Sequence, residues 1–350
     1  MAQFQEIPII GTTGLSRTSR RSEYDITNQV NTTDPAAVND EVRRVFLQLY
    51  PDAPTALMSR AFADCARLYR GEYFGYRGCD TPYHNLQHVL DVTLAMARLM
   101  DGYERASARP ERLGARLFGF GIVTALFHDI GYLRHRNDTR HRNGAEYTLR
   151  HVSRGARFLE RYMRDIGMPD LAQLAGRVIH FTGYEIPVQY IEVPSLVFRL
   201  IGNMLGTADI IAQMADRCYL EKCRDRLYPE FVHGGLASAA ASERQPTAPF
   251  TSAEDLLRKT PSFYRTAFTR LTDNLGAAYH YVEASFAGHN PYLDEVAKNI
   301  RYAEWVAMKG DLRLLRRIPP PRDASTASLP VYPKLPQTTA EDRQASAALR

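Results

Sequence analysis

Apolar residues recur at helical spacing through most of this chain. In four stretches they return every three or four residues, the period that gathers them on one face of an α-helix: residues 89–99, 117–127, 171–179 and 196–205. The alternating pattern of a half-buried strand is scarce. The best strand candidate, residues 186–194, carries prolines near both ends and favours an extended loop. The sequence therefore predicts an all-α chain, predominantly helical from about residue 36 to residue 317.

Three polar segments divide the chain. Residues 1–35 are rich in Ser, Thr and Arg, residues 318–350 are rich in Pro, Ala and Ser, and both lack apolar periodicity, so we expect two tails without fixed structure. A Gly-, Ala- and Ser-rich break between two helical stretches predicts a loop or linker at residues 233–253. The expected organisation is a main helical domain at 36–232 and C-terminal helices at 254–317 that pack on it.

Composition narrows the class of protein. The chain has 350 residues, of which 45% are hydrophobic and 24% charged, as in soluble globular proteins. Its longest uncharged apolar stretch, residues 117–127, falls short of the roughly 18 apolar residues of a membrane span, and residues 1–21 lack the apolar core of a secretory signal. The four cysteines form no CxxC pair. We expect a cytoplasmic protein without a membrane partner, and the net charge of +5 without a dense basic run does not indicate nucleic acid. The oligomeric state stays open.

Histidines and aspartates stand at positions where burial without a partner is costly. His84 and His88 are four residues apart and would share one face of a helix. His128 and Asp129 follow the apolar stretch 117–127 directly, and a metal ion would compensate for burying an imidazole beside a carboxylate. Each later helix adds one candidate ligand in an apolar or helical context: His151, His180 and Asp209.

The order of these residues resembles the metal-ligand series of the HD superfamily of metal-dependent phosphohydrolases, over residues 80–220. Residues 83–88, YHNLQH, are also similar to the YHNxxH signature of class I cyclic nucleotide phosphodiesterases, and FHDIG follows forty residues on. The resemblance implies an HD-domain or phosphodiesterase-like helical bundle. It implies a first metal held by His88, His128, Asp129 and Asp209, with Asp129 bridging to a second metal held by His151 and His180. His84 matches the residue that protonates the leaving oxygen, although some branches place a metal ligand there.

Such a ligand set suits hydrolysis of a phosphoester. Two divalent ions about 3.5–4 Å apart can share a hydroxide that attacks phosphorus, and imidazole and carboxylate ligands suit Mn, Fe or Zn, while an open position admits Mg. Arg134, Arg136 and Arg140, in the loop after the His-Asp pair, could clamp phosphate oxygens. Glu146 could orient a ligating imidazole, or it could simply begin a helix.

Two departures limit the substrate. The purine-reading glutamine of the cyclic nucleotide enzymes has no counterpart between residues 251 and 305, and Tyr132 stands where the cyclic di-nucleotide branch has lysine. The prediction is a metal-dependent phosphohydrolase for a phosphodiester of a (cyclic) nucleotide, acting through a metal-bridging hydroxide. The alternatives are a nucleotide or dinucleotide polyphosphate hydrolase and a non-catalytic nucleotide-sensing module.

Overall fold

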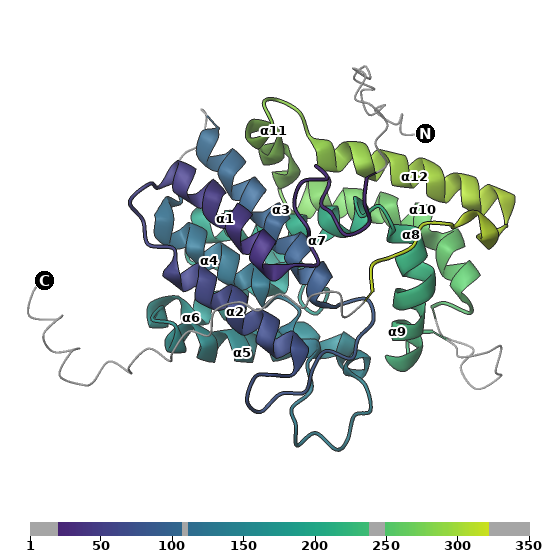
Figure 1. The fold of residues 1–350 in the computed structure, drawn as a ribbon, viewed down its shortest axis with the longest axis horizontal. Coiled ribbons are helices and arrows are strands. Elements are labelled where there is room, and N and C mark those ends of the chain that lie inside the picture. Colours follow the sequence, from purple (N-terminus) through teal and green to yellow (C-terminus); the bar gives the residue numbers. More distant parts are fainter. Residues whose placement is uncertain (1–19, 107–110, 238–248, 322–350) are drawn as a thin grey trace, which may run out of the picture.

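The computed structural model describes residues 20–106, 111–237 and 249–321, and every regular element within these ranges is helical (Figure 1). The first half holds α1 (Pro35–Leu49), α2 (Ala56–Arg70), α3 (Leu86–Arg105), α4 (Gly114–Leu126), α5 (His151–Asp165) and α6 (Ala172–Val178). The second half holds α7 (Leu196–Met214), α8 (Tyr219–Lys222), α9 (Tyr228–His233), α10 (Ala253–Thr269), α11 (Tyr281–Ser285) and α12 (Pro291–Lys309). The all-α prediction is confirmed, and the strand candidate at 186–194 contains only a short 3-10 turn, η5 (Val188–Tyr190).

Helix α3 forms the centre of the bundle. It packs against α1, α4, α7 and α11, and its residues from Gln87 to Glu104 are almost all buried (Figure 1). A helix that is surrounded on all sides by other helices needs apolar residues around most of its circumference. Polar side chains on α3 are therefore exceptions that need a partner, and His88 in its first turn is one of them.

The segment after α4 lies directly against the start of α5. The 3-10 turn η1 (Ile130–Tyr132) packs on α5, and a Cβ atom on Gly131 would lie 1.7 Å from the carbonyl oxygen of His151. Only glycine permits this approach. The close packing brings Asp129, which precedes η1, next to His151, the first residue of α5.

Part of the predicted N-terminal tail is folded. Residues 20–34 lie on α3, where Asp25 is 4% exposed and its Oδ2 accepts a hydrogen bond from Arg98 at 2.5 Å. The Oδ1 atom of Asp25 accepts from the backbone amides of Gln29 and Val30, both at 3.0 Å. The expectation of a tail without fixed structure is wrong for residues 20–34, because this carboxylate is buried with enough donors to satisfy it. Residues 1–19 lie outside the described part of the chain.

The C-terminal helices pack on the helices that precede them. Helix α11 lies on α3, and α12 packs on α7 and α10 (Figure 1). Residues 318–321 of the predicted C-terminal tail are also placed, since the carbonyl oxygen of Pro320 accepts a hydrogen bond from Arg226. Residues 322–350, and residues 238–248 of the predicted linker, lie outside the described part. None of the described helices is both long enough and apolar enough to cross a membrane.

Candidate metal centre

His88 enters the site from the first turn of α3. The side chain of Asn85 caps the helix by accepting a hydrogen bond from the His88 amide at 3.2 Å, so the helix begins at Leu86. The expectation that His84 and His88 share one helical face is therefore wrong, because His84 precedes the cap. The chain nevertheless turns so that the two rings lie 5.5 Å apart, edge to face.

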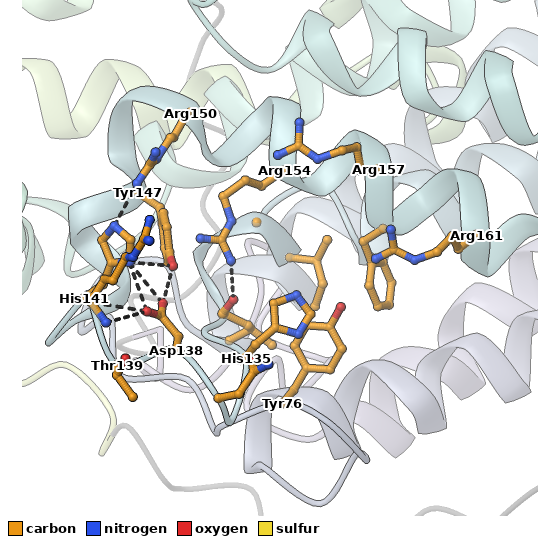
Figure 2. Close-up of a pocket in the computed structure, with 16 residues that line it drawn as sticks. Tyr76, His135, Asp138, Thr139, His141, Tyr147, Arg150, Arg154, Arg157 and Arg161 are labelled. Carbon is orange, nitrogen blue, oxygen red and sulfur yellow. Dashed lines mark hydrogen bonds and ion pairs between the residues drawn. The ribbon is translucent and has the colours of Figure 1, made fainter.

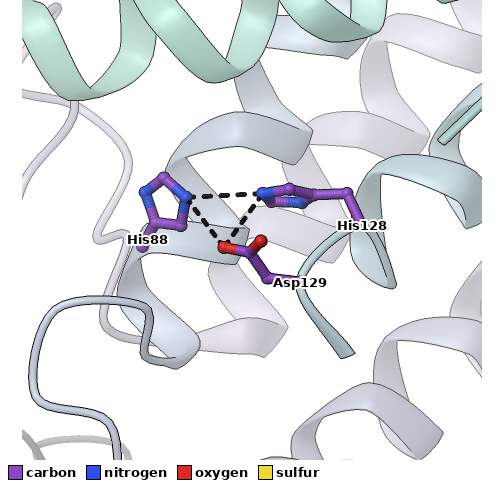
Figure 3. A group of neighbouring side chains, drawn as sticks. All are labelled: His88, His128 and Asp129. Atoms are coloured by element: carbon purple, nitrogen blue, oxygen red, sulfur yellow. Dashed lines mark hydrogen bonds and ion pairs between the residues drawn. The ribbon is translucent and has the colours of Figure 1, made fainter. Parts of the chain in front are cut away.

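His128 and Asp129 leave the end of α4 and turn into the same space. His128 is fully buried, and its Nδ1 lies 2.8 Å from the carbonyl oxygen of Ala125, where it donates a hydrogen bond. A backbone carbonyl on one ring nitrogen fixes the tautomer and leaves the other nitrogen available as a ligand. Figure 3 shows the Nε2 atoms of His88 and His128 pointing toward each other, with the carboxylate of Asp129 beside them.

Four side chains from three parts of the chain converge here. The Oδ2 atom of Asp129 lies 3.3 Å from Nε2 of His88 and 3.3 Å from Nε2 of His128, and these two nitrogens are 3.3 Å apart. From α7, the Oδ1 atom of Asp209 lies 3.4 Å from Nε2 of His88 and 3.8 Å from Nε2 of His128. The ligand atoms of His88, His128 and Asp129 all lie within 4.8 Å of one another, close enough to hold one ion.

The second oxygen of Asp129 faces a different imidazole. Its Oδ1 lies 3.6 Å from Nε2 of His151, the first residue of α5. The Nδ1 of His151 lies 2.7 Å from the carbonyl oxygen of Thr148, so its ring is oriented in the same way as that of His128. Asp129 thus stands between two sets of imidazole nitrogens, with one carboxylate oxygen toward each.

The electrostatics of the cluster match a site for positive charge. Burial disfavours protonation of both imidazoles, but the carboxylates of Asp129 and Asp209 outweigh it and raise the pKa of His88 and that of His128 to about 9. Burial acts in the opposite direction on the carboxyl groups, yet the neighbouring imidazoles hold the pKa of Asp129 and that of Asp209 below the usual range. Both carboxylates are ionised near neutral pH.

The residues fit a divalent metal ion. Oδ2 of Asp129 is buried and forms no hydrogen bond of good geometry, although two nitrogens lie 3.3 Å away. Buried carboxylate oxygens rarely lack a partner, and converging imidazole and carboxylate groups are the donors that Zn, Mn and Fe ions prefer.

No known protein family, curated protein or solved structure matches this chain. A function is therefore inferred from the geometry of the site.

Glu230, which the sequence analysis did not single out, and Tyr132 complete the surroundings of His84. Glu230 of α9 is fully buried and contacts the Nδ1 of His84 through its Oε1, while its Oε2 accepts from the Tyr83 amide at 2.9 Å. The ring of Tyr132 contacts the rings of both His84 and His151, at centroid distances of 4.6 and 4.3 Å. Burial lowers and the Glu230 carboxylate raises the pKa of His84, and the net direction is upward. Glu230 carried no sequence signal of a shared site, since it lies 146 residues from His84 along the chain.

Several predicted site residues have other roles. His180, on η4 (Ile179–Phe181), makes no hydrogen bond or ion pair with Asp129 or His151 among the described interactions, but its Nδ1 is buried without a hydrogen-bond partner. Glu146 does not orient an imidazole: its Oε1 accepts from the amides of Arg142 and Asn143 at 2.6 and 2.9 Å, which caps η2 (Gly144–Arg150). The helix-start alternative is the one observed.

The predicted arginine clamp is largely used for structure. Arg134 forms an ion pair with Asp80 at 2.6 Å, and Arg136 donates to the carbonyl oxygens of Tyr76 and Gly71, both at 3.0 Å. These contacts hold the loop in place, and the assignment of Arg134 and Arg136 to substrate binding stays a prediction. Arg140 is exposed, and its guanidinium has no hydrogen-bond or ion-pair partner among the described residues.

Proposed function

We propose that this protein is a metal-dependent phosphohydrolase of the HD type that cleaves a phosphodiester bond of a nucleotide. The observation that carries the proposal is the position of Asp129. Its two oxygens face separate imidazole groups, and the oxygen toward His88 and His128 is buried without a hydrogen bond. A carboxylate placed in this way is suited to bridge two ions.

The side chains have separate tasks in this proposal. His88, His128, Asp209 and Oδ2 of Asp129 would hold one divalent ion, and Oδ1 of Asp129 with His151 would contribute to a second, to which His180 is a further candidate ligand. When bound, such ions supply an activated water and neutralise charge on phosphate oxygens. The carbonyl groups of Ala125 and Thr148 keep two of the imidazoles in the tautomer that ligation requires.

His84 and Glu230 favour a phosphodiester over a polyphosphate. Glu230 is buried, contacts Nδ1 of His84 and stabilises the imidazolium form, so His84 can keep a proton for donation near neutral pH. A departing sugar oxygen is strongly basic and needs such a proton, whereas a departing phosphate does not. The His84 ring also stands close to the cluster, with its centroid 5.5 Å from that of His88.

The test is hydrolysis of bis-p-nitrophenyl phosphate with added Mn²⁺ by the wild-type chain, by Asp129→Asn and by Asp170→Asn. Asp170 is an exposed carboxylate paired with Arg116 at 2.6 Å, so Asp170→Asn controls for the loss of one carboxylate elsewhere. We expect turnover by the wild type and by Asp170→Asn and none by Asp129→Asn. Absence of turnover in all three proteins with Mn²⁺, Zn²⁺, Fe²⁺ and Mg²⁺ would overturn the proposal and favour the sensing module.

Product analysis then identifies the bond that is cleaved. Cyclic and linear nucleotide phosphodiesters are compared with nucleoside and dinucleoside polyphosphates as substrates of the same preparation. Preferential release of a nucleoside monophosphate from a phosphodiester supports the proposal. Preferential cleavage of a phosphoanhydride would replace it with a polyphosphate hydrolase.

A further inference from the structure

A second cavity, of about 500 Å³, lies outside the metal centre. It is bounded by the loop after η1, by η1 itself and by one face of α5, and Figure 2 shows its side chains. A volume of this size lies within the range of small-molecule sites, which is about 300–1,000 Å³. None of the six predicted metal ligands lines it.

Five arginines surround this cavity, which we call the arginine pocket: Arg140, Arg150, Arg154, Arg157 and Arg161. The last three lie on α5 with spacings of three and four residues, which places them on one side of the helix. Among the described residues, none of the five guanidinium groups lies within ion-pair distance of a carboxylate, and Arg157 has no hydrogen-bond partner either.

One acidic residue, Asp138, lines the arginine pocket, and its carboxylate forms hydrogen bonds with its own loop. The carboxylate of Asp138 accepts hydrogen bonds from the hydroxyl of Tyr147 and from the amides of Arg140 and His141, at 3.0 and 3.2 Å for the amides. It also lies 3.1 Å from Nδ1 of His141. Five arginines face this one carboxylate, so positive charge remains in excess around the cavity.

Some of the guanidinium groups are held in place. Arg154 lies 3.1 Å from the centroid of the Tyr147 ring and donates to the carbonyl oxygen of Leu133 at 3.1 Å. Arg150 lies 2.7 Å from Nε2 of His141. Such contacts reduce the side-chain entropy that would be lost on binding, so these groups are partly preorganised for an anionic ligand.

The HD segment, residues 128–133, separates the arginine pocket from the metal centre. Ile130, Gly131 and Leu133 line the pocket, whereas the ring of Tyr132 does not line it and contacts His84 and His151. The arginine pocket and the metal centre are thus adjacent along the backbone of residues 128–133. No predicted metal ligand lines the pocket.

We propose that the arginine pocket binds a small polyphosphorylated anion, at a site separate from the metal centre. Guanidinium groups match phosphate oxygens with paired hydrogen bonds, and five of them spread around one cavity suit a chain of phosphates better than a single carboxylate. This inference goes beyond the proposed hydrolysis and does not depend on it, because binding here needs no metal ion.

The experiment is isothermal titration calorimetry of the full chain with inorganic triphosphate, in buffer containing EDTA. The test variant is the double substitution Arg157→Gln with Arg161→Gln, which removes two exposed positive charges from the pocket. The control is Arg177→Gln with Arg265→Gln, which removes two exposed charges from α6 and α10, away from the pocket. Circular dichroism checks that both variants keep the helical content of the wild type.

We expect one triphosphate per chain, and an affinity at least about tenfold weaker in the pocket variant but unchanged in the control, since a hydrogen bond between charged groups accounts for at least that factor. A parallel titration with ATP distinguishes a free polyphosphate from a nucleotide, because tighter binding of ATP indicates contacts with the base. Equal weakening in both double variants, or no binding of triphosphate, would overturn the proposal. So would tight binding of single-stranded RNA that triphosphate does not displace.

Discussion

Two groups of histidine, aspartate and tyrosine side chains lie on either side of the HD segment, and they differ in how far their polar atoms are satisfied. In the loop, Asp138 accepts hydrogen bonds from Tyr147 and from two backbone amides and contacts His141. In the centre, Asp129 is buried among imidazoles, and its Oδ2 has no hydrogen bond.

Asp138 and Asp129 show that residue type alone does not identify a ligand site. A satisfied carboxylate such as Asp138 stabilises its own loop and has no need of an ion. The buried carboxylate of Asp129 is offset, without metal, by protonated imidazoles 3.3 Å away, and a metal ion can replace those protons.

The largest expected difference between the two groups concerns their histidines. His128→Gln should lower the rate of bis-p-nitrophenyl phosphate hydrolysis by at least about 10³-fold, because loss of a ligand should exceed the 10- to 100-fold loss that follows from removing a group that merely orients a ligand. His141→Gln should leave the rate within about twofold, since no ligand role is assigned to it. The measurement is kcat/KM for both variants at saturating Mn²⁺. Similar losses in both would contradict the assignment of His128, but not His141, as a metal ligand.

The next effect concerns proton donation by His84. His84→Asn should lower hydrolysis of a diester with an alkyl leaving group by about 10²-fold or more, with a smaller loss for the p-nitrophenyl diester, whose leaving group needs no proton. Because the required form of His84 is protonated and its pKa is raised, activity should fall as the pH rises through that pKa.

Glu230→Gln tests the pH dependence of proton donation by His84. It removes the carboxylate that raises the pKa of His84, so the alkaline fall in activity should begin at a lower pH than in the wild type. The measurement is the pH profile of kcat with bound metal verified in each variant. An unchanged profile would show that His84 does not act as the acid.

Asp25 tests whether burial alone identifies a site. It is as buried as Asp129, but its oxygens accept from Arg98 and backbone amides. Asp25→Asn should destabilise the fold by about 3–5 kcal/mol, because Arg98 would be left as an uncompensated buried charge. The exposed counterpart Asp170→Asn should cost at most about 1 kcal/mol. Urea denaturation measures both, and equal costs would contradict the account of the N-terminal segment.

The last prediction concerns the pH dependence of metal binding. His88 and His128 have pKa values of about 9 without metal, so protons compete with the ion below that pH. The affinity for Mn²⁺ should therefore rise by about tenfold per pH unit for each proton displaced, and level off above about pH 9. Calorimetry in buffers of different ionisation enthalpy counts the protons released, and a pH-independent affinity would contradict the cluster as a ligand site.

Local sequence patterns predicted the helices and many of the clustered residues. The period of apolar residues is a local property, and polar residues such as His128 and Asp129 stand out against it, so both the all-α fold and the buried pair could be predicted. The structure also brings Asp209 and His151 to this pair. What could not be predicted depends on contacts between distant segments. Glu230 looks like an ordinary surface residue until α9 brings it to His84, and Asp25 looks like part of a polar tail until it meets Arg98.

Loop arginines show the same limit. Arg134 and Arg136 have the chemistry of phosphate ligands. Their hydrogen bonds, however, go to Asp80 and to backbone carbonyl groups, most of them in a segment more than fifty residues earlier. The sequence alone does not distinguish the arginines of α5 from those of any exposed helix, because only the fold places them around a cavity with Arg140.

The most direct measurement is the metal content of the protein purified without chelator, determined by plasma mass spectrometry for the wild type, Asp129→Asn and Asp138→Asn. The account predicts about two divalent ions per chain in the wild type and in Asp138→Asn, and loss of both in Asp129→Asn, because one carboxylate would bridge the pair. Equal metal content in the wild type and Asp129→Asn, or no metal in any of the three after incubation with Mn²⁺ or Zn²⁺, would contradict it.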